Sequence, residues 1–121
     1  KRNSIVGCAN ENSCVLIGKN TTIGFNSIII SSERIEIGSD CMIAPNVYIG
    51  DSNHGMSPDL PFNQQENVVS AILIEDNVWI GAHSIIKTGV EIGTPLIKFS
   101  HKSENSFLVN FSIEFSKISF P

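Results

Sequence analysis

Among the side chains that could carry chemistry, His54 has the most informative surroundings. It lies in the polar stretch DSNHG (51–55), and the eighteen residues 55–72 that follow contain two prolines and no regular pattern. Long loops without structure of their own are usually functional or disordered. Histidine is well suited to proton transfer near neutral pH, so His54 could act as a general base on an attacking hydroxyl. The alternative for a lone imidazole in a polar turn is a solvated surface group.

The other histidines and the cysteines do not form a metal site along the sequence. The three histidines are widely separated, whereas zinc needs three or four ligands close together. The three cysteines contain no CxxC pair and leave one unpaired in any disulfide scheme. We therefore expect no metal, and a reducing compartment such as the cytoplasm. The residues concerned are His54, His83 and His101, and Cys8, Cys14 and Cys41.

Length and charge exclude several classes of protein. The 121 residues allow one domain, and a net charge of −4 with only two arginines argues against a nucleic-acid partner. No run approaches the ~18 apolar residues of a membrane span, so we expect none. Lys1 is not an initiator methionine, and no charged-then-apolar leader follows it. We therefore expect the chain to be a fragment of a longer reading frame.

A repeat with a period of six residues predicts the elements that must position these side chains. Ten isoleucines share one phase, and a small residue follows most of them. The phase includes Ile17, Ile23, Ile29, Ile37, Ile43, Ile49, Ile74, Ile80, Ile86 and Ile92. A period of six fits neither a helix nor an unbroken strand, but it fits a short strand followed by a corner. Glycine after the isoleucine permits a corner where a side chain would crowd or φ must change sign.

Three such units would close a triangular coil of eighteen residues, with a two-residue slip at Ile35 and Glu36. About four coils would then pair in parallel and stack isoleucine upon isoleucine. A prism this short has open ends and flat faces that need covering, so we expect an oligomer.

The same phase predicts which side chains point outward. Tyr48 and Trp79 each precede an inward isoleucine, and continuing the alternation places His54 in the outward class. Aromatic side chains left on a surface often mark a contact with a ligand or another subunit. Asp51 could hold the imidazole of His54 or bind a substrate, and an ordinary corner carboxylate is the alternative.

The repeat also resembles a known family. The segments IGSDCMIAPNVYIG (37–50) and IEDNVWIGAHSIIKTGVEIG (74–93) are similar to the hexapeptide-repeat acyltransferases. DSNHG, the long insert and NVWIGA (77–82) resemble the branch that O-acetylates sugars and polysaccharides, including maltose, galactoside and capsular acetyltransferases. The resemblance implies a left-handed parallel β-helix, a homotrimer with sites between subunits, acetyl-CoA as co-substrate, and a sugar or polysaccharide acceptor.

Site residues follow from this resemblance position by position. It implies that His54 is the general base and that Trp79 lies beside the reacting centre, where it contacts both acceptor and coenzyme A. Gly81 and Ala82 match the segment whose backbone N–H reaches toward the acyl group or the pantetheine arm. Independently of the resemblance, the outward phase of Tyr48 and the place of Asp51 three residues before His54 make both candidates for binding the acceptor.

The end of the chain departs from the family pattern. We expect a repeat domain over 1–97, with an extruded loop at 51–73, and an atypical tail over 98–121 that is irregular or forms one cap strand. The tail lacks glycine and the six-residue phase. The alternative function is therefore a truncated or frameshifted relative that keeps the β-helix without a complete coenzyme A site. An ice-binding solenoid fits less well, because no face carries a regular Thr-x-Thr ladder.

Overall fold

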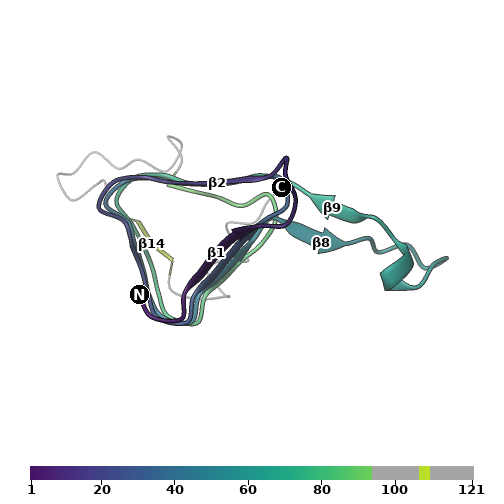
Figure 1. Ribbon diagram of the computed structural model, residues 1–121, viewed down its shortest axis with the longest axis horizontal. Coiled ribbons are helices and arrows are strands. Elements are labelled where there is room, and N and C mark those ends of the chain that lie inside the picture. Colours follow the sequence, from purple (N-terminus) through teal and green to yellow (C-terminus); the bar gives the residue numbers. More distant parts are fainter. Residues whose placement is uncertain (94–106, 110–121) are drawn as a thin grey trace.

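The computed structural model describes residues 1–93 and 107–109. Three parallel sheets of four strands each form the sides of a triangular prism, and a two-stranded antiparallel arm leaves one corner (Figure 1). The expected left-handed parallel β-helix of about four coils is confirmed. One sheet contains β1 (Ile5–Cys8), β4 (Ile28–Ser31), β7 (Tyr48–Gly50) and β12 (Ile85–Ile86). The second contains β2 (Cys14–Ile17), β5 (Arg34–Ile37), β10 (Ile72–Ile74) and β13 (Glu91–Ile92). The third contains β3 (Thr22–Ile23), β6 (Met42–Ile43), β11 (Val78–Ile80) and β14 (Phe107–Val109).

The strand register agrees with the expected coils of eighteen residues and with the two additional residues between the first two of them. Ile17 pairs with Ile37 and Ile28 with Tyr48, a spacing of twenty residues that equals eighteen plus the two of the slip, whereas Ile74 pairs with Ile92, eighteen residues later. At the slip itself, Ile35 is part of β5 and is fully buried, so the additional residues do not interrupt the sheet. Because side chains alternate along a strand, Ile35 points to the same side as Ile37, two positions later. The second sheet thus has two inward positions in β5, Ile35 and Ile37, and two in β10, Ile72 and Ile74.

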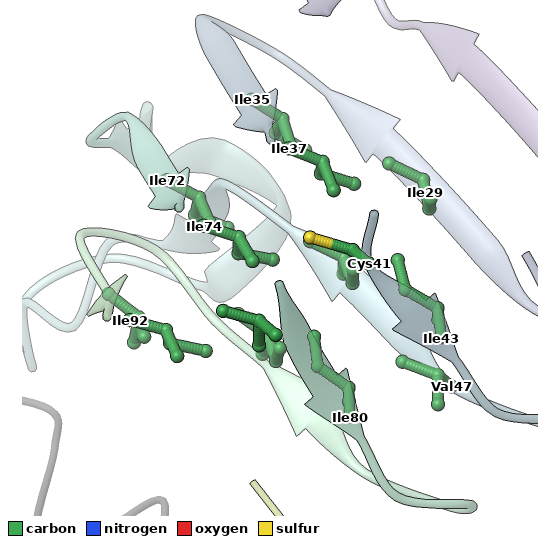
Figure 2. Packing of buried hydrophobic residues seen from close by; sticks show 14 residues of the cluster. Ile29, Ile35, Ile37, Cys41, Ile43, Val47, Ile72, Ile74, Ile80 and Ile92 are labelled. Atoms are coloured by element: carbon green, nitrogen blue, oxygen red, sulfur yellow. The ribbon is translucent and has the colours of Figure 1, made fainter. Parts of the chain in front are cut away.

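The isoleucine stack forms the core, as predicted (Figure 2). Of the ten isoleucines in the shared phase, eight are at most 3% exposed, and Ile17, at the open end of the second sheet, is 38% exposed. The eight are Ile29, Ile37, Ile43, Ile49, Ile74, Ile80, Ile86 and Ile92. Ile23 is only partly buried, because the first coil has no coil beneath it. Cys41 lies in this core, and burial raises the pKa of its thiol, so it remains a protonated apolar side chain.

The corners show which property of glycine the repeat uses. Positive φ falls three positions after the inward isoleucine, mostly at asparagine, as at Asn20 and Asn46 with φ of 58° and 60°. The glycine directly after the isoleucine serves close approach instead. A Cβ at Gly18 would lie 2.5 Å from the backbone nitrogen of Ser39 in the next coil. Crowding between coils, and not the sign of φ, therefore requires glycine at Gly18, whereas Gly93, which follows Ile92, has a positive φ of 77°.

The extruded segment is narrower than the expected 51–73. It comprises β8 (Ser52–His54), a short 3-10 helix (Phe62–Gln64) and β9 (Asn67–Val69). Asp51 and Ile72 are buried at its two ends, because both continue the inward alternation of neighbouring strands. β14 pairs in parallel with β11, and the rest of the predicted tail, with its boundary at 97–98, lies outside the described residues.

Candidate functional site

The arm that carries His54 begins at a buried carboxylate. Asp51 has no solvent exposure, and its two oxygens accept four hydrogen bonds from the corner of the preceding coil. The donors are Ser31 Oγ at 2.9 Å, Ser32 N at 2.6 Å, Glu33 N at 2.9 Å and Arg34 N at 2.8 Å. Burial by itself raises the pKa of the Asp51 carboxyl, but these hydrogen bonds outweigh it and hold the pKa below its ordinary value. Asp51 is thus an ionised group that stabilises the root of the arm.

His54 lies at the end of β8, on the outside of the prism. Its backbone is opposite Asn67 of β9, and its side chain is exposed. The antiparallel pairing continues through Ser52 and Val69 to the root of the arm. A short, hydrogen-bonded ribbon therefore holds the imidazole in a place that an approaching substrate can reach.

The rest of the arm is organised by a side chain that the sequence did not single out. The Gln65 carboxamide donates to Ser57 O at 2.9 Å and Leu60 O at 2.7 Å, and accepts from Ser57 N at 2.8 Å. It also lies against Gly55, where a Cβ would be 2.7 Å from Gln65 Oε1. The segment after His54 is thus a folded loop. No periodicity marks Gln65, so the sequence carried no signal for this role.

Tyr48 lies along the strand that leads to the arm. Its ring packs over Gly50, where a Cβ would be 2.5 Å from the Tyr48 hydroxyl. The Lys87 ammonium is 5.4 Å from the ring centroid, and its Nζ donates to Ser52 O at 3.4 Å. Tyr48 is half-buried, so the exposed part of its side chain is still accessible for the predicted contact with an acceptor.

Trp79, Gly81 and Ala82 lie elsewhere on the prism. Trp79 is 52% exposed on β11 and stacks beside Met42, which is 59% exposed. Gly81 is buried and Ala82 is exposed, both at the corner after β11. The arm leaves the corner between the other two sheets (Figure 1). A single chain therefore places Asp51, Tyr48 and His54 at or near the root of the arm. Trp79, Gly81 and Ala82 lie on a different side of the prism.

Two further findings on the described residues concern metal binding and membrane spans. Over 1–93 and 107–109, no group of three or more His, Cys, Asp or Glu side chains could hold a metal ion. Within the same residues, no helix has the length and apolar character needed to cross a bilayer.

Comparison with known proteins gives consistent matches. Residues 14–51 and 71–94, just over half of the chain, match the family described as hexapeptide repeat of succinyl-transferase. A galactoside O-acetyltransferase of Escherichia coli is 38% identical over 81 residues, which cover 67% of this chain and 39% of that protein. A galactoside O-acetyltransferase of Lactococcus lactis is 37% identical over 82 residues, covering 63% of this chain and 39% of its own length.

A solved structure agrees with these sequence matches. The crystal structure of a maltose O-acetyltransferase from Clostridium difficile superposes with a TM-score of 0.58 at 33% identity, covering 72% of this chain and 48% of that chain. The chain spans about two fifths of the length of the curated relatives it matches. The unmatched gap at 52–70 in the repeat coincides with the arm.

Proposed function

Because this chain belongs to the hexapeptide-repeat acyltransferase family, we propose that it moves an acetyl group from acetyl-CoA to a hydroxyl of a sugar or polysaccharide. The observation that carries the proposal is the placement of His54: an exposed imidazole on a hydrogen-bonded arm, three residues from a buried anchor in the coil. The names of the matched relatives support the acetyl group and the sugar acceptor.

In the proposed reaction, His54 takes the proton of the acceptor hydroxyl as that oxygen attacks the thioester carbonyl carbon. The carbon–oxygen bond forms, the carbon–sulfur bond then breaks, and coenzyme A leaves as a thiol after receiving the proton from the imidazolium. Backbone N–H groups near Gly81 and Ala82 would face the acyl oxygen or the pantetheine arm, as the resemblance implies. Trp79 would line the same groove, and Tyr48 would contact the acceptor near the root of the arm.

The proposed assembly is a homotrimer, in which His54 of one subunit faces the Trp79 side of its neighbour. Two features of a single chain support this arrangement. His54 and Trp79 lie on different sides of the prism, so a complete site needs a second subunit. The arm and the third sheet both expose large apolar side chains, including Phe62 and Met42, which are 62% and 59% exposed. Cyclic symmetry would make three equivalent sites.

We also propose a cytoplasmic location. Three free cysteines, of which Cys8 is exposed, fit a reducing compartment better than an oxidising one.

The decisive experiment measures thiol release from acetyl-CoA in the presence of galactosides, maltose and acetylatable polysaccharides. We expect His54→Ala to lower turnover by about 10²- to 10⁴-fold, the range for loss of a general base. Coenzyme A binding by calorimetry and the thermal midpoint should stay nearly unchanged, because an exposed imidazole contributes little packing. His83→Ala, an exposed corner histidine, is the matched control and should retain activity.

Two results would contradict the proposal. If the wild-type chain does not bind coenzyme A at millimolar concentration, the non-catalytic alternative replaces the enzyme. If sedimentation shows a stable monomer at micromolar concentration, the shared site and the trimer are wrong.

A further inference from the structure

Asp51 is the one charged side chain that is buried within residues 1–93. The other buried polar side chains there are serines: Ser13, Ser27, Ser31 and Ser84. An isolated carboxylate is strongly disfavoured in an apolar interior unless charges or hydrogen bonds compensate it. Asp51 also stands at the single point in the described coils where the chain leaves the stack for the arm. Its burial and its position therefore call for a common explanation.

At the corners, backbone N–H groups of one coil normally donate hydrogen bonds to backbone carbonyls of the next coil. Gly18 N donates to Ile37 O at 2.8 Å, and Gly38 N donates to Ile74 O at 2.7 Å. At the corner over residues 31–34 this pattern stops, because the next coil departs as β8 and returns only at β10. The backbone N–H groups of Ser32, Glu33 and Arg34 all donate to the Asp51 carboxylate instead. The side chain takes the place of carbonyls that the missing corner would have supplied.

The backbone of the same residue also closes the arm. Ser70 N donates to Asp51 O at 3.1 Å, which joins the two ends of the arm. From the following coil, Gly89 N donates to Ser70 O at 3.0 Å, and Lys87 Nζ reaches Ser52 O. Asp51 therefore connects the arm to the preceding coil, while Lys87 and Gly89 connect it to the following one.

We infer that Asp51 is a positioning residue for His54: its carboxylate substitutes for the absent coil corner and so fixes the direction in which the arm presents the imidazole. This inference rests on the proposed function for its catalytic consequence, but its structural part stands on the hydrogen bonds alone. Two oxygens of a carboxylate offer about four acceptor sites, which matches three N–H groups and one hydroxyl. An asparagine would keep the shape but replace one acceptor oxygen with an N–H₂ donor that faces other donors.

The test is amide hydrogen exchange on the full chain, read by NMR or mass spectrometry. For Asp51→Asn we expect the amides of β8 and β9 to exchange about 10- to 100-fold faster, the factor that one hydrogen bond to a charged group contributes. Amides of β6 and β11, in the sheet away from the arm, should change much less. Asp76→Asn is the matched control: Asp76 is an exposed corner carboxylate that accepts one hydrogen bond, from Ser39 N at 2.7 Å, at a corner without an arm.

A milder variant keeps the test usable if Asp51→Asn does not fold. Ser31→Ala removes one donor from the carboxylate and leaves the three backbone donors, so the same regional acceleration should appear at a smaller size. Turnover gives the second measurement. Asp51→Asn should lower kcat while leaving KM for acetyl-CoA unchanged, since that binding groove lies on another side of the prism.

The outcomes separate this inference from the proposed function. Uniform acceleration of exchange in all strands, or no more acceleration in β8 and β9 than Asp76→Asn produces, would overturn the positioning role even if the wild type is active. Regional acceleration in a chain without any acetyl transfer would leave the arm anchor in place and refute the enzyme.

Discussion

The coils and the arm are two regions of one chain that hold themselves together by different means. In the coils, isoleucines from successive turns stack in a continuous core, and parallel ladders join each turn to the next. In the arm, no residue from Ser52 to Ser70 is buried. Its order comes from a three-residue antiparallel pairing, from Gln65, and from Asp51 at its root.

This difference separates stability from chemistry. Burial of apolar area stabilises the coils, and the repeat distributes that stabilisation over every turn. The arm contributes little of it and is free to hold polar groups and exposed apolar side chains in a shape suited to contact. The exposed imidazole of His54 on the arm can thus have varied surroundings without weakening the core.

The largest expected contrast comes from truncating one apolar side chain in each region. Ile80→Ala should lower the free energy of unfolding by about 2–5 kcal/mol, because it leaves a cavity between stacked isoleucines. Met56→Ala should change it by about 0.5 kcal/mol or less, because Met56 is 82% exposed on the arm. Urea denaturation measures both values. Equal losses would mean that the arm shares the core of the coils.

A methyl group added to a glycine gives a smaller contrast of the same kind. At Gly24 a Cβ would lie 2.5 Å from Pro45 N and 2.7 Å from Ala44 O, which are backbone atoms of the next coil. Gly24→Ala should cost about 1–3 kcal/mol, since the stacked backbones must separate. At Gly55 the nearest atom is the end of the Gln65 side chain, which can move. Gly55→Ala should therefore shift the thermal midpoint less, and the reverse order would contradict this account of the coil spacing.

Acid should weaken the junction between the two regions. The pKa of Asp51 is lower in the folded chain than its ordinary value, so its stabilising contribution is complete above about pH 4 and decreases as the pH falls through the lowered value. We expect the free energy of unfolding to decline below about pH 4, with the decline reduced in Asp51→Asn. Denaturation curves between about pH 2 and 7 measure this. An identical decline in the variant would assign the acid sensitivity to other carboxylates.

The smallest effect on stability is expected at the tip of the arm. Gln65→Ala removes three hydrogen bonds within the loop, but the loop is exposed and packs on no core residue. Amides over 56–65 should exchange faster, while the free energy of unfolding changes by about 0.5 kcal/mol or less. Gln64→Ala, at an exposed neighbouring side chain, is the control. A large loss of global stability would show that the tip supports the coils.

The alternation of inward and outward side chains along the strands is enough to predict much of the site. One of its consequences, at Asp51, is absent from the expectations based on the sequence. The phase of the isoleucines predicted that Trp79 and His54 point outward, and the structure places both side chains at the surface. The same phase places Asp51 inward, two positions after Ile49, and so could have predicted its burial. Gln65 and Lys87 have no such signal. The backbone oxygens that Gln65 binds come near it only in the folded arm, and Lys87 meets the Tyr48 ring only once β12 pairs with β7.

The sequence by itself determined the parallel prism, since one isoleucine phase with a small residue after it can be buried only by stacking short strands around a common axis. Tertiary structure alone decided that Ile35, at the two-residue slip, belongs to the core, because its burial follows from pairing with Val15 and Ile72. It also decided how the arm leaves the stack. The carboxylate of Asp51 meets three N–H groups seventeen to nineteen positions earlier in the chain, and contacts across that separation arise from the winding of the coil.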